Sequence, residues 1–366
     1  MAYQLRVCDL RSDDVLDVLP IEQVTFDDYI SRTGSLSGTI PLPNRSLAQR
    51  ARAALTPGRT MLYLERATTF GTEIAWGGIL WTRTPTMADR TLTMSIQAAT
   101  IESYIRSHRI LLTNVTYHQI DQLDIVRQML DGIQGTPGGD IGIDADYSQL
   151  SGVLRDRTYL GADLHFAGEL WDQLAACEDG FEWRVAIYRD AAGLHRKDLR
   201  LGYPQISITG EDLILDSPGP ILAYSLPEDA TTMANLWLAR GASINQNQAV
   251  DSYPLMAGPL FAPEDWAAGW PQLDGSSNYP STEEPDTLFQ HAVADLARAR
   301  QPVIIPTVSY ASADARQPQL GSYVRLRIQD DWYPEMHSAR YRIVGLRVAP
   351  EERGRHETTE LYLEAA

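Results

Sequence analysis

The sequence predicts an α+β protein that is mainly β, with strand-rich regions at both ends of the chain. Apolar and polar residues alternate with a period of two in many segments rich in β-branched and aromatic side chains. Turn-forming residues separate these segments at short, even intervals, which is typical of a β-barrel or sandwich. The 366 residues suffice for two or three domains, and the 44% apolar content suffices for packed cores.

Residues 1–105 are expected to form a β-barrel or sandwich. Alternating residues predict strands over 4–7, 33–42, 61–66, 73–81 and 91–97. Pro57-Gly58 and Phe70-Gly71 supply turns between them. A short helix is predicted over 45–54, because Leu47 and Ala51 share one face with Ala54.

Residues 106–200 are expected to form a helical side domain with a β-hairpin. One helix is predicted over about 119–131, with an apolar stripe and with Gly132 and Gly135 at its end. A second helix is predicted over about 163–178, where Gly180 stops it. The hairpin is predicted from the alternating segments 181–188 and 195–202, which a turn at 190–193 connects.

The second strand-rich region covers residues 201–250 and 301–366. Its strands are predicted over 205–208, 221–226, 232–241, 303–310, 323–328, 339–348 and 357–364. Residues 251–300 indicate a loop-rich insertion with many prolines and one helix over about 286–300. Aromatic side chains on loops often contact partners, so Trp266 and Trp270 are candidate partner-contact residues. The alternative is that both side chains pack beneath their own loop, and the two interpretations are equally favoured.

The formal net charge is −17, which argues against binding of nucleic acid phosphates, because such binding needs clustered cations. Residues 119–182 hold thirteen Asp and Glu but three Arg, whereas residues 301–366 are nearly balanced. The acidic region is either a solvated surface or a wall that repels passing DNA, and charge alone does not separate the two.

The basic residues are 30 Arg and a single Lys, Lys197, which indicates a GC-rich coding bias and hence a GC-rich host. No run of about 18 apolar residues occurs, so no membrane span is expected. The first residues lack the apolar core of a signal peptide, so the chain is expected to be made in a cytoplasm.

The motifs of common enzyme classes do not occur. The sequence holds neither GxGxxG after a strand nor GxxxxGK[ST], HExxH or GxSxG, so no cofactor and no catalytic residue is predicted. Two carboxylate pairs, Glu178 with Glu182 and Asp330 with Asp331, could in principle serve a glycosidase. Both pairs lie beside turns, where acidic side chains commonly cap backbone N–H groups and contact solvent. A structural role is therefore favoured for both.

Two further groups of residues could bind a metal ion. Asp140, Asp144 and Asp146 resemble a calcium loop, but their spacing differs from that of an EF-hand, and a polar loop is the favoured interpretation. Cys8 and Cys177 form no CxxC pair and match no zinc-ligand spacing. Cys177 is expected in a helix core, and a disulfide between the two has little support in a reducing compartment.

The order of these elements resembles the hub proteins at the tip of phage tails, including the hub-like minor tail proteins of long-tailed phages that infect actinobacteria. The resemblance covers nearly the whole chain. The residues that carry it are Gly77-Gly-Ile-Leu, Asp121-Gln-Leu-Asp-Ile-Val-Arg127, Gly180-Phe-Glu-Trp-Arg-Val with Leu199-Arg-Leu-Gly-Tyr-Pro204, and Leu320-Gly-Ser-Tyr-Val-Arg-Leu with Tyr341-Arg-Ile-Val-Gly-Leu-Arg-Val-Ala-Pro350.

The resemblance implies two tube-type β-barrels, the first at 1–105 and the second at 201–250 and 301–366. The side domain would be 106–200, and the insertion at 251–300 would touch neighbours or host-recognition proteins. Three copies would form a ring in the virion that adapts the tail tube to the tip and lets DNA pass. The implied partners are further copies of the chain, tail tube and distal tail proteins, the tape measure protein, and tip fibre or receptor-binding proteins.

Two alternatives stay open. The chain could be a distal tail ring or adaptor, which six copies instead of three would indicate. It could also be a tail-associated cell-wall hydrolase or carbohydrate-binding protein, although the chain carries no appended lysozyme, peptidase or β-helical spike.

Overall fold

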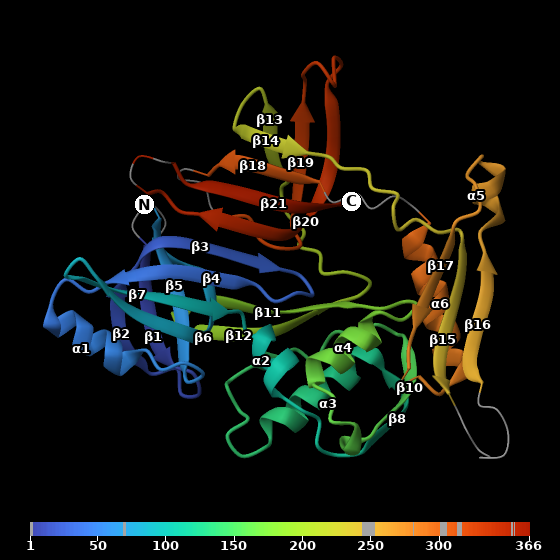
Figure 1. Cartoon of the computed structure of the whole chain (residues 1–366), viewed down its shortest axis with the longest axis horizontal. Helices are drawn as coiled ribbons and strands as arrows, with labels where there is room; N and C mark the ends of the chain where they lie inside the picture. Colours follow the sequence, from blue (N-terminus) through green and yellow to red (C-terminus); the bar gives the residue numbers. More distant parts are fainter. Residues whose placement is uncertain are drawn as a thin grey trace. The chain divides into compact units, whose positions relative to one another are not determined.

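The computed structural model describes the chain except for residues 1–2, 69–70, 244–252, 281, 301–305, 313–316, 353 and 355. The fold is mainly β, as predicted, with helices spread between residues 45 and 299. The chain divides into two compact units (Figure 1). Unit 1 comprises Met1–Trp171, Glu182–Ser225 and Thr307–Ala366, and unit 2 comprises Asp172–Phe181 and Leu226–Pro306. No helix in the described part of the chain is long and apolar enough to cross a membrane.

Unit 1 is built on one 13-stranded sheet to which both ends of the chain contribute. The N-terminal strands are β1 (Tyr3–Asp9), β2 (Val15–Pro20), β3 (Glu22–Tyr29), β4 (Ser35–Pro41), β5 (Thr60–Thr68), β6 (Gly71–Ala88) and β7 (Thr91–Ala99). The C-terminal strands are β13 (Leu213–Ser217), β14 (Ile221–Ser225), β18 (Thr307–Ala311), β19 (Tyr323–Ile328), β20 (His337–Ala349) and β21 (Thr358–Ala365).

The strand order is β14-β18-β21-β20-β3-β4-β7-β6-β5-β1-β2, and β13 with β19 joins through β20. Neighbours are antiparallel except for the parallel pair β13 and β19. Among the described residues this pairing runs as an open path and closes no barrel. The predicted two barrels therefore stay a proposal, whereas the predicted strand-rich ends are confirmed.

The pairing of β3 with β20 joins the two strand-rich ends. Phe26 lies opposite Val348, and Tyr29 lies opposite Gly345. Gly345 is required there, because a Cβ atom at this position would lie 2.4 Å from Cδ1 of Tyr29. The Tyr29 ring also packs against Tyr362 of β21, with centroids 5.5 Å apart. The junction is thus packed as well as hydrogen-bonded.

Local sequence explains why most N-terminal elements form where they were predicted. In β4, Leu36 and Ile40 are buried while Ser35 and Ser37 are exposed, so one face of the strand meets the core. The helix α1 (Arg45–Ala54) begins where the Asn44 side chain accepts a hydrogen bond from the backbone N–H of Leu47.

Two N-terminal strands were not predicted. β2 and β3 carry four Asp and Glu between them, which obscures the period-two pattern. The acids are tolerated because they have partners. Asp28 forms an ion pair of 2.7 Å with Arg184, and Asp27 accepts hydrogen bonds from Ser35.

The side-domain segment of unit 1 contains short helices and two small sheets. Its elements are α2 (Glu102–His108), β8 (Val115–Asp121), α3 (Gln122–Gln134), β9 (Asp144–Ala145), β10 (Leu154–Tyr159), the 3₁₀ helix η1 (Gly161–Asp163), β11 (Glu182–Arg189) and β12 (His195–Gly202). The helix α4 (Ala167–Ala175) follows η1 and runs into unit 2. β8 pairs with β10, and β9 joins the predicted hairpin β11–β12.

The first predicted helix of this segment begins three residues later than expected and ends later. Asp121 belongs to β8, and its carboxylate caps α3 by accepting from the N–H of Leu123. Gly132 lies within the helix, and Gly135 ends it, with its N–H bonded to the carbonyl of Asp131. The strand predicted over 205–208 is wrong. The N–H of Ile206 donates to Glu182 instead of to a neighbouring strand.

Unit 2 is a three-stranded sheet with a helix packed on it. Its elements are β15 (Leu236–Ser243), β16 (Pro254–Phe261), α5 (Pro263–Ala267), β17 (Asp274–Asn278) and α6 (Pro285–Ala299). The sheet order is β16-β15-β17, and α6 buries Leu288 and Ala292 against Ala239 and Ala257.

The segment at 254–278, where the sequence indicated loops, therefore holds two strands and a short helix. Its prolines are compatible with this, because Pro254 begins β16 and Pro263 stands in the first turn of α5. The helix predicted at 286–300 is α6. Residues 303–305 of the strand predicted at 303–310 lie outside the described residues, and β18 begins at Thr307.

Candidate functional site

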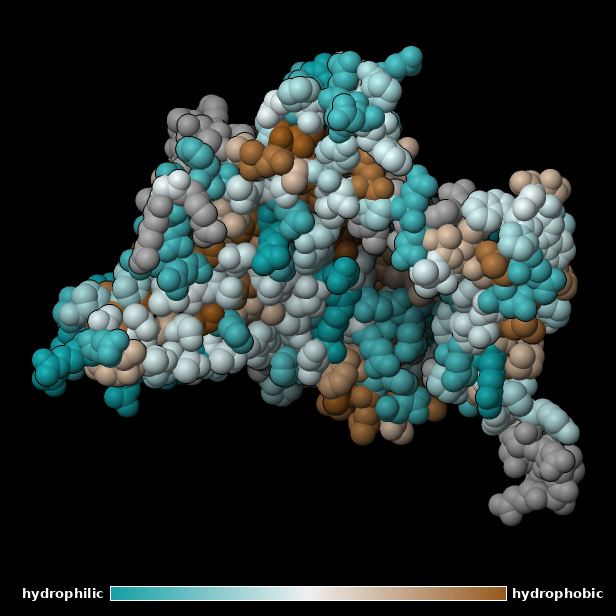
Figure 2. Space-filling view, turned by 45° about the horizontal axis from the view of Figure 1, so that its top comes forward, coloured by the Kyte–Doolittle hydropathy of each residue, from teal (hydrophilic) through white to brown (hydrophobic). Residues whose placement is uncertain are grey.

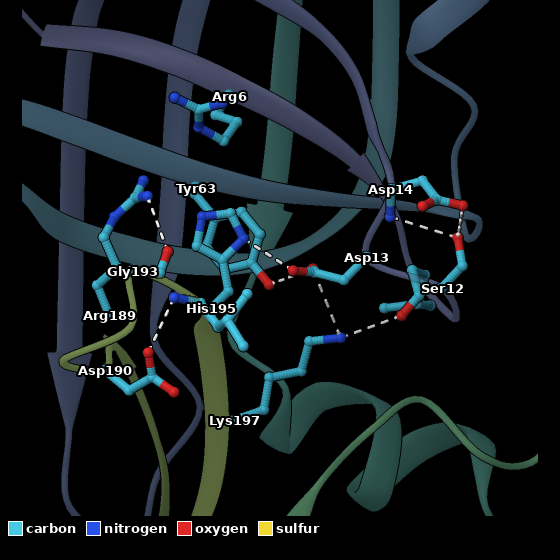
Figure 3. Close-up of polar contacts among 12 residues, drawn as sticks. Arg6, Ser12, Asp13, Asp14, Tyr63, Arg189, Asp190, Gly193, His195 and Lys197 are labelled. Carbon is cyan, nitrogen blue, oxygen red and sulfur yellow. Dashed lines mark hydrogen bonds and ion pairs between the residues drawn. The ribbon is translucent and has the colours of Figure 1, made fainter.

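The hairpin β11–β12 is fixed to the large sheet of unit 1 by polar contacts, and Figure 3 shows one group of them. Asp13, in the turn between β1 and β2, points toward Tyr63 of β5 and His195 of β12. Its Oδ2 atom lies 2.8 Å from Nδ1 of His195, and its Oδ1 atom accepts a hydrogen bond of 2.5 Å from the Tyr63 hydroxyl. The rings of Tyr63 and His195 pack with centroids 4.0 Å apart.

The turn that presents Asp13 is tight. Asp13 has a φ of 61°, in the left-handed region, which Asp and Asn adopt more readily than most residues. The Asp9 carboxylate holds the turn by accepting from the N–H groups of Arg11 and Ser12 at 3.0 and 3.2 Å. The local sequence thus explains why a carboxylate at this position can turn back toward the hairpin.

Lys197, the only lysine of the chain, completes the group from β12. It is buried, and its Nζ atom donates to the carbonyl oxygens of Leu10 at 3.1 Å and Ile141 at 2.8 Å. Nζ lies 4.0 Å from Oδ1 of Asp13. Burial lowers the pKa of Lys197, and the nearby Asp13 charge opposes that shift.

Asp13 is held as a carboxylate. Burial acts to raise the pKa of Asp13, but the hydrogen bonds from His195 and Tyr63 and the positive charge of Lys197 outweigh it and leave the pKa lowered. The same arrangement raises the pKa of Tyr63, first by burial and then through its bond to Asp13.

Cys8 lies beside this group, and ligand atoms of Cys8, Asp13 and His195 fall within 4.8 Å of one another. Such a set resembles a thiol nucleophile with its base, or a metal site. The thiol is fully buried, and burial raises the pKa of Cys8 to about 12, so it is neutral, unlike an activated nucleophile. The carboxylate and imidazole are bonded to each other beside an ammonium group, an arrangement suited to packing rather than to metal binding.

A second buried group lies where β11 crosses the N-terminal strands. Glu65 of β5 is fully buried and accepts from Nε of Arg6 at 2.7 Å and from Nε2 of Gln4 at 2.9 Å. Arg189 of β11 also donates to Glu65. Burial acts to raise the pKa of Glu65, but these donors outweigh it and leave the pKa lowered.

The start of β11 is bound in turn to the C-terminal strands. Arg342 of β20 is 1% exposed and donates to both carboxylate oxygens of Glu182 at 2.7 Å. It also donates to the carbonyl of Ile206 at 2.9 Å and to Glu364. The hairpin therefore bridges both strand-rich ends of unit 1 through ion pairs in which Glu65 and Arg342 are the fully buried partners.

The two candidate partner-contact residues differ in exposure. Trp266, on α5, is partly buried; its Nε1 atom donates to Asn235 at 2.9 Å, and its ring packs against Phe261 with centroids 5.9 Å apart. Trp270, after α5, is 43% exposed. Trp266 therefore packs within its own unit, whereas Trp270 lies at the surface.

The three candidate cation ligands serve local structure. Asp140 and Asp146 each accept from the N–H two residues onward, at 2.8 Å, to Gly142 and Ser148. Asp144 faces Arg196, with 3.6 Å between the ion-pair atoms. The partners of these carboxylates could not be predicted from the sequence, whereas the structure shows one for each.

The carboxylate pairs considered for catalysis are likewise engaged. Glu182 is bonded to Arg342, and Asp330 accepts from the N–H groups of Trp332 and Tyr333 and from the Tyr224 hydroxyl. The Tyr224 hydrogen bond lowers the pKa of Asp330, which is the opposite of what a general acid needs. Cys177 is buried, as predicted, and neither cysteine forms a disulfide.

Comparison with known proteins finds no matching family model and no matching curated protein. Solved structures do match over nearly the whole chain. The tail protein from Neisseria meningitidis MC58 has a TM-score of 0.59 at 12% identity, covering 99% of this chain and 96% of that chain. This chain has the fold of a tail protein.

Two further tail proteins support that statement. The 43 kDa tail protein of prophage MuSo2 from Shewanella oneidensis has a TM-score of 0.60 at 7% identity, covering 99% of this chain and 98% of that chain. The prophage tail protein gp18 from Listeria monocytogenes EGD-e has a TM-score of 0.52 at 12% identity, covering 98% and 94%. At these identities the likeness is one of fold.

Sequence reasoning missed the buried charges that stabilise this tail protein fold. One signal was available, because Glu65 and Arg66 continue the strand Met61-Leu-Tyr-Leu without a turn residue, so charged groups had to enter the core. Their partners could not be named, because Glu65 and Arg189 are 124 residues apart.

Proposed function

We propose that this protein is a structural, non-enzymatic hub of a phage tail tip and acts in the virion. Three copies form a ring that adapts the tail tube to the tip and lets DNA pass. The observation that carries the proposal is the fold likeness to phage tail proteins along nearly the full length of both chains. The buried contacts of unit 1 support the proposal, because a subunit of such a ring must keep its fold under mechanical force.

The two strand-rich ends serve as tube-type modules in this proposal, at 1–105 and at 201–250 with 301–366. The strands β2 and β14 stand at the ends of the described sheet path, each with a neighbour on one side. Unpaired strand edges readily contact another chain. Such edges are where copies of the ring would meet.

The charge of the chain fits a channel for DNA. Residues 119–182 carry most of the acidic excess, and two of their three arginines, Arg127 and Arg155, are buried. An acidic surface repels DNA phosphates and lets the duplex slide. In the proposed ring this acidic excess lines the channel or the outer face, and the seams between copies are less acidic.

The remaining partners follow from the position of a hub. Tail tube, distal tail and tape measure proteins would bind along the ring axis, and tip fibre or receptor-binding proteins would bind its periphery. Residues 251–300 would touch such neighbours, with Trp270 as the contact residue and Trp266 as support. The arginine bias supports a GC-rich host, as in phages of actinobacteria.

Native mass spectrometry tests the copy number. A mass three times the 40.8 kDa of one chain supports the hub. Six copies would favour the distal ring, and a monomer at all concentrations would contradict the proposal. A peptidoglycan zymogram tests the hydrolase alternative, and clearing that Glu182→Gln or Asp330→Asn abolishes would refute a non-enzymatic role.

A further inference from the structure

The connection between β19 and β20 presents an exposed tryptophan. Trp332 is 80% exposed, and Met336, in the same turn, is 60% exposed. Tryptophan is enriched among the residues that dominate binding energy in protein interfaces. We call residues 329–336 the Trp332 tip.

The Trp332 tip is held in one conformation. The Asp330 carboxylate accepts from the N–H groups of Trp332 and Tyr333, both at 2.9 Å, and the Tyr224 hydroxyl of β14 donates to it. The ring of Tyr333 stacks on His337 with centroids 4.5 Å apart. A turn that is already ordered loses little entropy when it binds.

The Trp332 tip is also acidic. Asp330, Asp331 and Glu335 lie in it, and no Lys or Arg occurs between Arg327 and Arg340. Figure 2 shows hydrophobic side chains at the surface of the upper part of unit 1, which holds β13 and β14, and Leu222 of β14 is 60% exposed. The tip thus combines apolar side chains with negative charge at the β14 end of the sheet.

A surface with exposed arginines lies at the other end of the sheet path. The exposed Asp14 borders it. Asp17 of β2 pairs with Arg50, which leaves Arg45 and Arg52 to face a partner. The residues between Tyr29 and Glu65 include five Arg and no acid. Three of these arginines are exposed on α1: Arg45, Arg50 and Arg52.

The edge strand β2 adds apolar side chains to that surface. Arg50 donates to Asp17 of β2 through Nε at 3.0 Å, which places α1 against this strand. Val15 and Leu16, at the start of β2, are 53% and 48% exposed. We call these residues with the α1 arginines the α1–β2 surface.

We propose that the Trp332 tip of one copy docks on the α1–β2 surface of the next copy in the ring. This inference rests on the proposed ring. A contact between two different surfaces at opposite ends of one sheet runs head to tail, and such contacts form a ring when the rotation between successive copies closes. The apolar groups meet at the centre, and the acids of the tip face the arginines of α1.

Analytical ultracentrifugation of matched variants tests the contact. Trp332→Ala is expected to weaken self-association by roughly thirtyfold or more, as at interface hot spots. The control is Leu112→Ala, which removes another exposed apolar side chain, 68% exposed and outside both surfaces, and is expected to leave self-association unchanged. Because both positions are at the surface, thermal unfolding of both variants is expected to match that of the parent.

A charge exchange tests the pairing itself. Asp331→Arg with Glu335→Arg, and separately Arg45→Glu with Arg52→Glu, are each expected to weaken association. An equimolar mixture restores the charge pairing between unlike copies, but a ring of three must place two like copies side by side, so the four substitutions are combined in one chain. That chain is expected to regain association.

The outcomes distinguish this inference from the proposed function. A parent protein that forms trimers, with variants that associate equally well, would overturn the contact and leave the hub standing. Failure of the combined chain to regain association would also overturn it. A parent protein that never associates would overturn both.

Discussion

The imidazole Nδ1 atom of His195 lies 2.8 Å from the Asp13 carboxylate, although 182 residues separate them in sequence. The contact connects the β1–β2 turn to the hairpin β11–β12. Together with Lys197, it places opposite charges where the side-domain hairpin meets the N-terminal strands. These charged residues stabilise the junction between the hairpin and the N-terminal strands. Their role is structural.

Replacing Asp13 by Asn should destabilise the protein by about 1–3 kcal/mol at neutral pH, because Lys197 and His195 lose a charged acceptor. The pKa of Asp13 is lowered in the fold, so its contribution is present above the unfolded value of about 3.9. That contribution is lost as the pH falls through the lowered folded pKa. Urea unfolding at a series of pH values checks this.

The matched control for Asp13 is Asp14→Asn, because Asp14 is exposed and bonds to Ser12 within the same turn. We expect a change of about 0.5 kcal/mol or less. Equal acid sensitivity of the Asp13→Asn variant and the parent would contradict the role of Asp13.

Arg342 and Arg340 offer a matched pair on β20. Arg342→Ala should cost about 2–4 kcal/mol, because it leaves Glu182 without its bidentate partner, although the half-exposed Glu364 reduces the loss. Arg340 forms its pair with Asp212 at the surface, where water screens the charges, so Arg340→Ala should cost much less than Arg342→Ala. Guanidinium unfolding midpoints compare them, and similar losses would show that burial of Arg342 is unimportant.

Cys8 should be inert in the folded protein. Its thiol is fully buried, and burial raises its pKa to about 12, so the reactive thiolate is scarce at pH 8. In a Cys177→Ala variant, we expect an aromatic disulfide reagent to titrate no thiol natively and one thiol in guanidinium. Rapid native titration would point instead to an accessible, activated cysteine.

Lys197 provides a probe of the same junction. Since it is the only lysine and its ammonium group bonds to Leu10 and Ile141, an amine-reactive ester should leave its side chain unmodified until unfolding. Peptide mass spectrometry across a urea series measures the modification. Early modification, before global unfolding, would mean that the hairpin detaches on its own.

Elements set by local chemistry were predictable from sequence. The cap at Asn44 and the apolar face that follows locate α1, and alternating residues locate β12 at 195–202. β3 was missed because its acidic residues depend on partners such as Arg184, 156 residues away. The strands β16 and β17 were missed because Pro254 and the polar Asp274–Asn278 conceal a sheet that β15 and α6 complete.

The partners of the buried charged residues could not be predicted from the sequence either. A sequence reveals that Glu65 interrupts an apolar strand, but not that Arg6, Gln4 and Arg189 surround it, because such partners are set by the tertiary fold. The sequence likewise did not predict that Trp270 is exposed and Trp266 partly buried, because their exposure depends on the position of α5.

Cryo-electron microscopy of the intact particle tests the central claim most directly. The account predicts three copies of this chain in a closed collar at the tail tip, with density for the DNA path at its centre. Density that places the chain outside any collar, or in six copies around the tube, would contradict it.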